Sequence, residues 1–161
     1  MALTTDILAS YRRPGAVLRR RAGGVVREDR ALITLMLACA LIFVAQWPRL
    51  SREAFVTEQE LNMLLGGALL GWLFVAPLGL YAIAAFSHLV ARLLGGQGTW
   101  YGARMALFWA LLAAAPLWLL WGLVAGLIGP GPALSATGVV ALGAFLAIWI
   151  AGLFAVERGE R

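Results

Sequence analysis

A cluster of glycines near the middle of the chain is the first feature that could carry chemistry, because Gly-rich turns can cradle phosphates. A Walker loop ends in Gly-Lys-Ser/Thr, and all 13 basic residues of this chain are arginine. The dinucleotide fingerprint allows two residues between its last two glycines, whereas three separate Gly98 from Gly102. The cluster instead predicts a tight turn, in which Gly95 and Gly96 end one helix with positive φ and Thr99 caps the next.

His88 and Cys39 are the only histidine and the only cysteine, which limits metal, haem and disulfide chemistry. Ser87 precedes His88, but no acid lies near them in sequence to complete a Ser-His-Asp set. We therefore predict no catalytic, cofactor-binding or metal-binding residue, no cofactor and no enzymatic activity. His88 remains a candidate functional residue, because polar groups inside a membrane are costly.

The composition indicates an integral membrane protein. Of the 161 residues, 62% are hydrophobic and only 13% are charged, far from the balance of an ordinary soluble domain. Several apolar runs approach the roughly 20 residues that a helix needs to cross the hydrocarbon core. We predict an all-α, polytopic membrane helix bundle with four transmembrane helices. The predicted spans cover residues 31–47, 61–90, 105–128 and 137–156, between an N-terminal segment (1–30) and a short cytoplasmic tail (157–161).

The second predicted span, residues 61–90, would measure about 45 Å as a straight helix, longer than the hydrocarbon core. Pro77, followed by Gly79, predicts a bend within one kinked helix. Two shorter segments meeting near Pro77 are the alternative and would give five spans. A polar connection is expected before this span, over residues 48–60.

The residues just before the second span form a capping-box pattern. Thr57 and Glu60 have the required spacing, followed at once by apolar Leu61. We therefore expect the Thr57 hydroxyl to accept a hydrogen bond from the first turn of the second span, and Glu60 to reach back to the cap.

Arginines set the expected orientation, because cytoplasmic loops carry the excess of basic residues. Eleven of the 13 lie in the N-terminal segment, the loop between the second and third spans, and the tail, so both termini are expected in the cytoplasm. Arg49 and Arg52 are the two on the other side.

The N-terminal segment interleaves apolar residues with arginines and is broken at Pro14-Gly15. We interpret it as a basic interfacial segment in the headgroup plane, with a disordered basic tail as the alternative. Anionic lipid headgroups, and not nucleic acid, are the expected partner. The candidate contacts with the lipid surface or a protein partner are Arg12, Arg13, Arg19, Arg20 and Arg21.

Two pairs of glycines have the small-residue spacing that lets transmembrane helices approach closely, Gly67-x-x-x-Gly71 and Gly122-x-x-x-Gly126. Packing within the bundle is the default expectation, and contact with another chain or another copy is the alternative.

Residues 93–118, LLGGQGTWYGARMALFWALLAAAPLW, resemble the cytoplasmic turn and following span of bacterial members of the Yip domain family, whose eukaryotic members interact with Ypt and Rab proteins. The family has a Gly-Gly-x-Gly-Ser/Thr turn that leads into a helix with a mid-span proline. The matching residues are Gly95, Gly96, Gly98, Thr99 and Pro116. The basic segment with Pro14 is also similar, so the resemblance extends over about residues 10–155, although the family usually has five spans.

The resemblance implies a non-enzymatic, multi-pass membrane protein. The Arg-only, Ala- and Gly-rich composition is typical of a high-GC bacterium, so the expected location is the bacterial cytoplasmic (inner) membrane. We expect a protein that acts by association, as a membrane organiser or as an accessory subunit of a larger membrane complex. The alternative is a channel or carrier for a small or lipidic substrate, with His88 and the bend at Pro77 at its site.

Overall fold

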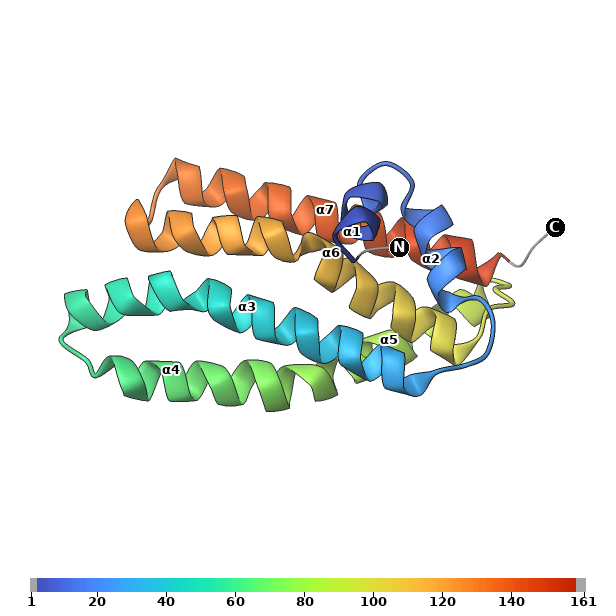
Figure 1. Ribbon diagram of the computed structural model, residues 1–161, viewed down its shortest axis with the longest axis horizontal. Coiled ribbons are helices and arrows are strands. Elements are labelled where there is room, and N and C mark those ends of the chain that lie inside the picture. The colour runs from blue at the N-terminus through green and yellow to red at the C-terminus, as the bar shows by residue number, and fades with distance from the viewer. Residues whose placement is uncertain (1–2, 159–161) are drawn as a thin grey trace.

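The computed structural model describes residues 3–158, which form helices joined by short connections. Four helices are long and apolar enough to cross a membrane, as the sequence predicts, and they run lengthwise beside one another (Figure 1). In chain order the elements are α1 (Leu3–Ser10), α2 (Pro14–Ala22), α3 (Glu28–Thr57), α4 (Leu61–Leu70), the π-helix η1 (Gly71–Val75), α5 (Ala76–Leu93), α6 (Trp100–Leu127) and α7 (Pro132–Glu157).

The first span is longer than predicted, because α3 continues through Pro48 to Thr57. The expected polar connection is therefore reduced to three residues. The predicted capping box is wrong: the Thr57 hydroxyl lies inside α3 and donates to the carbonyl oxygen of Glu53, at 2.7 Å. Glu58, with φ of 55°, then ends α3, and α4 starts after Glu60 without any side-chain cap.

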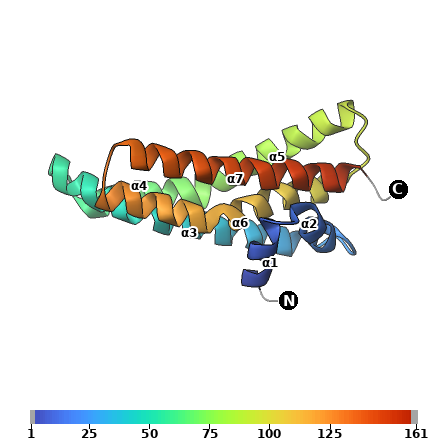
Figure 2. The same ribbon diagram turned by 90° about the horizontal axis from the view of Figure 1, so that it is seen from above.

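The second span is one continuous helical segment of 33 residues, so the single-helix prediction is confirmed and the five-span alternative is not. Its irregularity is the π turn of η1, which ends two residues before Pro77, and not a break at Pro77 itself. Proline has no N–H for the preceding turn, and a single π turn accommodates such a gap. Figure 2 shows that α5 diverges from α7 beyond this point. The connection from α5 to α6 then runs back toward the C-terminal end of α7.

The packed core surrounds the first half of α6. All residues from Tyr101 to Ala115 are buried except Arg104, which is partly buried and pairs with Glu28 of α3. α6 packs chiefly against α3 and α7, with α5 and the N-terminal helices covering its remaining sides. Beyond Pro116 the burial becomes intermittent. α6 is therefore the central helix of the bundle, and the other helices pack around it.

The N-terminal segment is ordered and docked on the bundle, so the disordered-tail alternative does not hold for residues 3–22. The break at Pro14 is confirmed, since α2 starts there. Buried Asp6 pairs with both Arg20 and Arg21, and the guanidinium of Arg21 lies 3.8 Å from the ring centroid of Trp109 on α6. The indole N–H of Trp109 donates to the Ser10 hydroxyl at 2.9 Å. These contacts fix α1 and α2 to the centre of the bundle.

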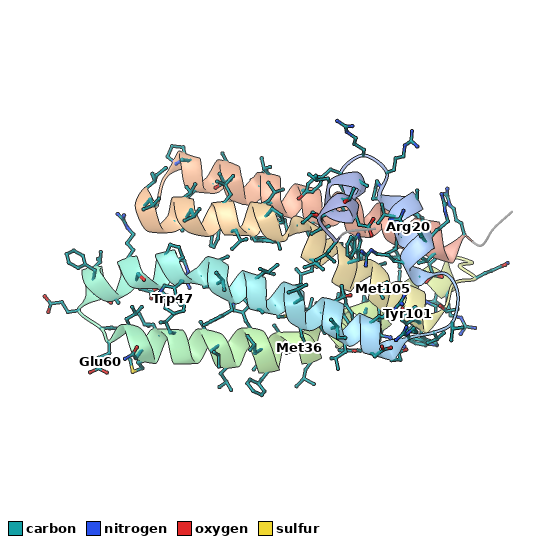
Figure 3. All side chains as sticks on the ribbon, viewed as in Figure 1. Arg20, Met36, Trp47, Glu60, Tyr101 and Met105 are labelled. Carbon is teal, nitrogen blue, oxygen red and sulfur yellow. The ribbon has the colours of Figure 1, made fainter. Side chains whose placement is uncertain are left out.

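The two ends of the bundle differ in character. Figure 3 places Trp47 and Glu60 toward one end, and Arg20 and Tyr101 toward the other. Contacts of α2 with α7 place the N-terminal helices beside the C-terminal part of the chain. This is the grouping that the arginine distribution predicts for the cytoplasmic side, although Arg161, which contributes to that distribution, lies outside the described residues.

Candidate functional site

A buried polar pair joins α5 to α7 at the end of the bundle that is predicted to be cytoplasmic. The Nδ1 atom of His88 donates to Oε1 of Glu157 at 2.6 Å. The side chains are only 1% and 5% exposed, respectively. The indole of Trp100 packs on the imidazole, with ring centroids 4.4 Å apart. Polar groups this deeply buried are tolerated when they are hydrogen-bonded to one another, so the pair couples the ends of the two helices.

The glycine cluster surrounds the same carboxylate. The backbone N–H of Gly98 donates to Oε2 of Glu157 at 3.0 Å, and the N–H of Gln97 donates to its backbone carbonyl at 2.8 Å. A Cβ on Gly98 would lie 2.8 Å from Oε2, and one on Gly96 would lie 2.6 Å from it. Glycine is needed at both positions because the carboxylate comes so close to the backbone. The turn does receive an acidic side chain, but that side chain belongs to the chain itself.

The ends of the turn follow the predicted helix chemistry with one correction. Gly95 has φ of 89° and ends α5, and the Thr99 hydroxyl accepts from the N–H of Gly102 at 3.0 Å, so both of these predictions are confirmed. Gly96 does not have positive φ, contrary to expectation. Its requirement for glycine comes from Glu157 and from the backbone of Ala91, which its own N–H contacts at 2.8 Å.

Sequence reasoning missed Glu157 and assigned it to the tail. It is instead the last residue of α7 and is buried, whereas residues 159–161 of that predicted tail lie outside the described part of the chain. One signal could have identified it. After Glu60 the chain contains only two acids, Glu157 and Glu160, so a buried histidine in that half had few possible partners.

A groove of about 640 Å³ opens beside the pair, between α5 and α7. Its walls are mostly apolar and include Phe86, Trp149 and Phe154. Glu157 and Arg158 contribute its charged groups. The groove could accept an apolar chain with a polar end, and its only titratable lining groups among the described residues are these two.

The predicted basic residues lie on the N-terminal helices and the link between them. Arg12, Arg13, Arg19 and Arg20 are exposed, whereas Arg21 is partly buried. Burial acts to raise the pKa of Asp6, but the hydrogen bonds and charges of Arg21 and Arg20 outweigh it and hold that pKa below its ordinary value. The carboxylate therefore stays charged at neutral pH and organises two of the five arginines.

The two glycine pairs have different surroundings. A Cβ on Gly122 would overlap the carbonyl of Ala45 in α3, and one on Gly126 would overlap Pro48. This pair lies where α6 meets the backbone of α3, as the default expectation requires. A Cβ on Gly67 or Gly71 would meet no atom within 4 Å in the described residues, so packing inside the bundle is the wrong expectation for that pair.

Comparison with known proteins adds no relative. The chain matches no family model, no curated protein and no solved structure. The Yip-type resemblance therefore stays a prediction based on the turn and on Pro116.

His88 and Glu157 are hydrogen-bonded to each other, and the backbone N–H of Gly98 donates a further hydrogen bond to the same carboxylate. We call the His88–Glu157 pair and the glycine turn around it the clamp. Within the described residues no group of three or more His, Cys, Asp or Glu side chains is placed to hold a metal ion. What the arrangement does is hold α5, the turn and α7 in one relative position at the end of a multi-pass membrane bundle.

Proposed function

We propose that the protein acts by association within the membrane, as an organiser or accessory subunit of a larger membrane complex. One observation carries the proposal: the second span is almost unburied. In its most apolar window only 6% of residues are buried, against 39% for the first span, 56% for the third and 17% for the fourth. This span is thus the one that the rest of the chain covers least.

The open surface has the chemistry of a helix contact. Gly67 and Gly71 share the spacing of Gly122 and Gly126, and the second pair shows within this chain what such spacing accommodates, namely the backbone of another helix. Small residues bring helices close enough for van der Waals contact, which drives association in lipid where the hydrophobic effect does not. The occupant we propose is a transmembrane helix of another protein in the same membrane.

Site-specific photocrosslinking tests the proposal. A photoreactive residue at exposed Leu70, one turn from Gly67 on the same face, is expected to give an adduct with a protein that also copurifies stoichiometrically in mild detergent. Substitution of Gly67 and Gly71 by leucine is expected to abolish both the adduct and the copurification, because the larger side chains keep the helices apart.

The matched control is a photoreactive residue at Val139 of α7, which is similarly exposed and lies on a different span. It is expected to react with lipid alone. A Leu70 adduct of twice the chain mass would identify a second copy as the occupant in place of another protein. Lipid adducts alone at both positions, with no copurifying protein, would contradict the proposal.

The groove beside Glu157 supports the alternative function, a carrier for a lipidic substrate. It joins an apolar wall to charged groups, which is the combination such a substrate needs, although neither the π turn nor Pro77 lines it. A liposome flux assay of the wild type and His88→Ala tests it. Flux that the substitution reduces supports the carrier, and absence of flux in both proteins rejects it.

A further inference from the structure

A second pocket, of about 420 Å³, lies where the N-terminal helices meet α3 and α6. Its charged lining consists of Arg20 and Arg21 from α2 and Arg30 from the start of α3. The other lining residues, all but one of them apolar, are Leu3, Ile33, Thr34, Leu37, Met105 and Leu112. Positive charge and apolar surface therefore occur together in one pocket. This pocket is separate from the clamp and from the exposed helix surface around Gly67 and Gly71.

One hydrogen-bond donor of this pocket is buried without an acceptor, and a second arginine of the lining is exposed and has no ion pair among the described residues. The Nε atom of Arg21 is buried and has no hydrogen-bond partner among residues 3–158, even though its Nη2 pairs with Asp6 at 2.5 Å. Arg30 has no ion pair in the same part of the chain, because the adjacent acids Glu28 and Asp29 pair with other arginines. Guanidinium groups with free donors are the preferred protein partners of phosphate oxygens.

The apolar part of the pocket continues inward from the charges. Thr34 and Leu37 follow Arg30 by about one and two turns, so at 1.5 Å per residue the lining reaches about 10 Å along α3. Arg30 stands at the beginning of the apolar stretch of this span, which is where lipid headgroups are expected. A lipid phosphate at the arginines would thus place its acyl chain beside Ile33 and Leu37, both exposed in the structure.

We propose that this pocket binds one anionic phospholipid, with its phosphate against Arg21 and Arg30 and an acyl chain along the apolar wall of α3. Arg20 lies beside the phosphate position and is engaged with Asp6. A zwitterionic lipid would bring its own ammonium next to the guanidiniums, and a free phosphate would leave the apolar wall uncovered. The pocket thus selects a lipid by net headgroup charge and by its chain together.

Native mass spectrometry of the full chain in detergent, with added phosphatidylglycerol or phosphatidylcholine, tests the proposal. One phosphatidylglycerol is expected to bind per chain, in preference to phosphatidylcholine. Arg30→Gln is expected to weaken this binding about tenfold, the effect of losing one charge-assisted hydrogen bond. Arg19→Gln removes an exposed charge from the same basic segment outside the pocket lining, and is expected to change binding by less than about twofold.

A second pair of variants tests the apolar wall without changing charge. Leu37→Ser should weaken phosphatidylglycerol binding, whereas Leu32→Ser, on the same helix but outside the lining, should not. Thermal unfolding without lipid confirms that each variant is folded. Equal losses for Arg30→Gln and Arg19→Gln would indicate diffuse charge attraction and overturn the proposal. Absence of preference for phosphatidylglycerol, or its full displacement by millimolar inorganic phosphate, would also overturn it.

Discussion

Glu157→Ala is expected to lower the free energy of unfolding by about 3 kcal/mol, the upper end of the cost of leaving a buried hydrogen-bonding group without its partner. The substitution leaves the imidazole of His88 buried without its acceptor and removes the acceptor of the Gly98 N–H. It also empties the space that requires glycine at position 96. The measurement is reversible unfolding in mixed detergent micelles, with the fold followed by circular dichroism.

The matched control is Glu53→Ala on α3. Glu53 pairs with Arg49 at 3.0 Å, but both side chains are about 41% exposed and lie one helical turn apart. Such a pair contributes only about 0.5 kcal/mol. A double-mutant cycle of His88→Ala and Glu157→Ala is expected to show strong coupling, because either change alone breaks the same contact. Equal effects of Glu157→Ala and Glu53→Ala would refute the clamp.

The chain's span number could be predicted because it depends on local composition. Apolar runs long enough to cross the bilayer are visible in the sequence, and the helical bundle follows from them. The end of the first span was predicted wrongly for a physical reason. Proline usually ends a helix, but Pro48 lies against Gly126 of α6, and this close contact supports a continuous α3.

The clamp could be predicted only in part, because its two halves lie 69 residues apart in sequence. The glycine spacing indicated a tight turn, and Gly95 and Thr99 behave as local rules require. The reason for Gly98 is tertiary, and that for Gly96 is partly so, since both depend on where the carboxylate of Glu157 lies while Gly96 is also close to the backbone of Ala91. A single sequence reveals that something approaches such glycines, but not which group it is.

The same distinction applies to the two Gly-x-x-x-Gly pairs, whose sequence spacing is identical and whose surroundings are opposite. Spacing alone predicts that a helix face can be approached, and tertiary structure decides whether this chain supplies the approaching helix. For Gly122 it does, because the backbone of Ala45 lies against it, and for Gly67 it does not. Replacing Gly122 by alanine and replacing Gly67 by alanine should therefore change the free energy of unfolding in opposite directions.

Gly122→Ala is expected to destabilise the protein by about 3 kcal/mol, at the upper end of the range for overpacking, because the new Cβ would overlap a backbone carbonyl. Gly67→Ala is expected to stabilise it by up to about 1 kcal/mol, since alanine favours the helix and its methyl group meets open space. Both values come from unfolding of the isolated chain in micelles. Equal effects of the two substitutions would show that the packing of α3 against α6 does not require the missing side chain of Gly122.

A rescue experiment separates backbone overlap from side-chain overlap. A Cβ on Gly152 of α7 would also be too close to a neighbour, but that neighbour is Cδ2 of Leu18, at 2.8 Å. Leu18→Val should therefore recover much of the stability lost in Gly152→Ala, because shortening the side chain removes the contact. No such rescue is expected for Gly122→Ala, because Ala45→Gly leaves the carbonyl in place. Recovery by Ala45→Gly would mean that the two helices are separated by side chains, and that α6 and α3 do not meet backbone to backbone.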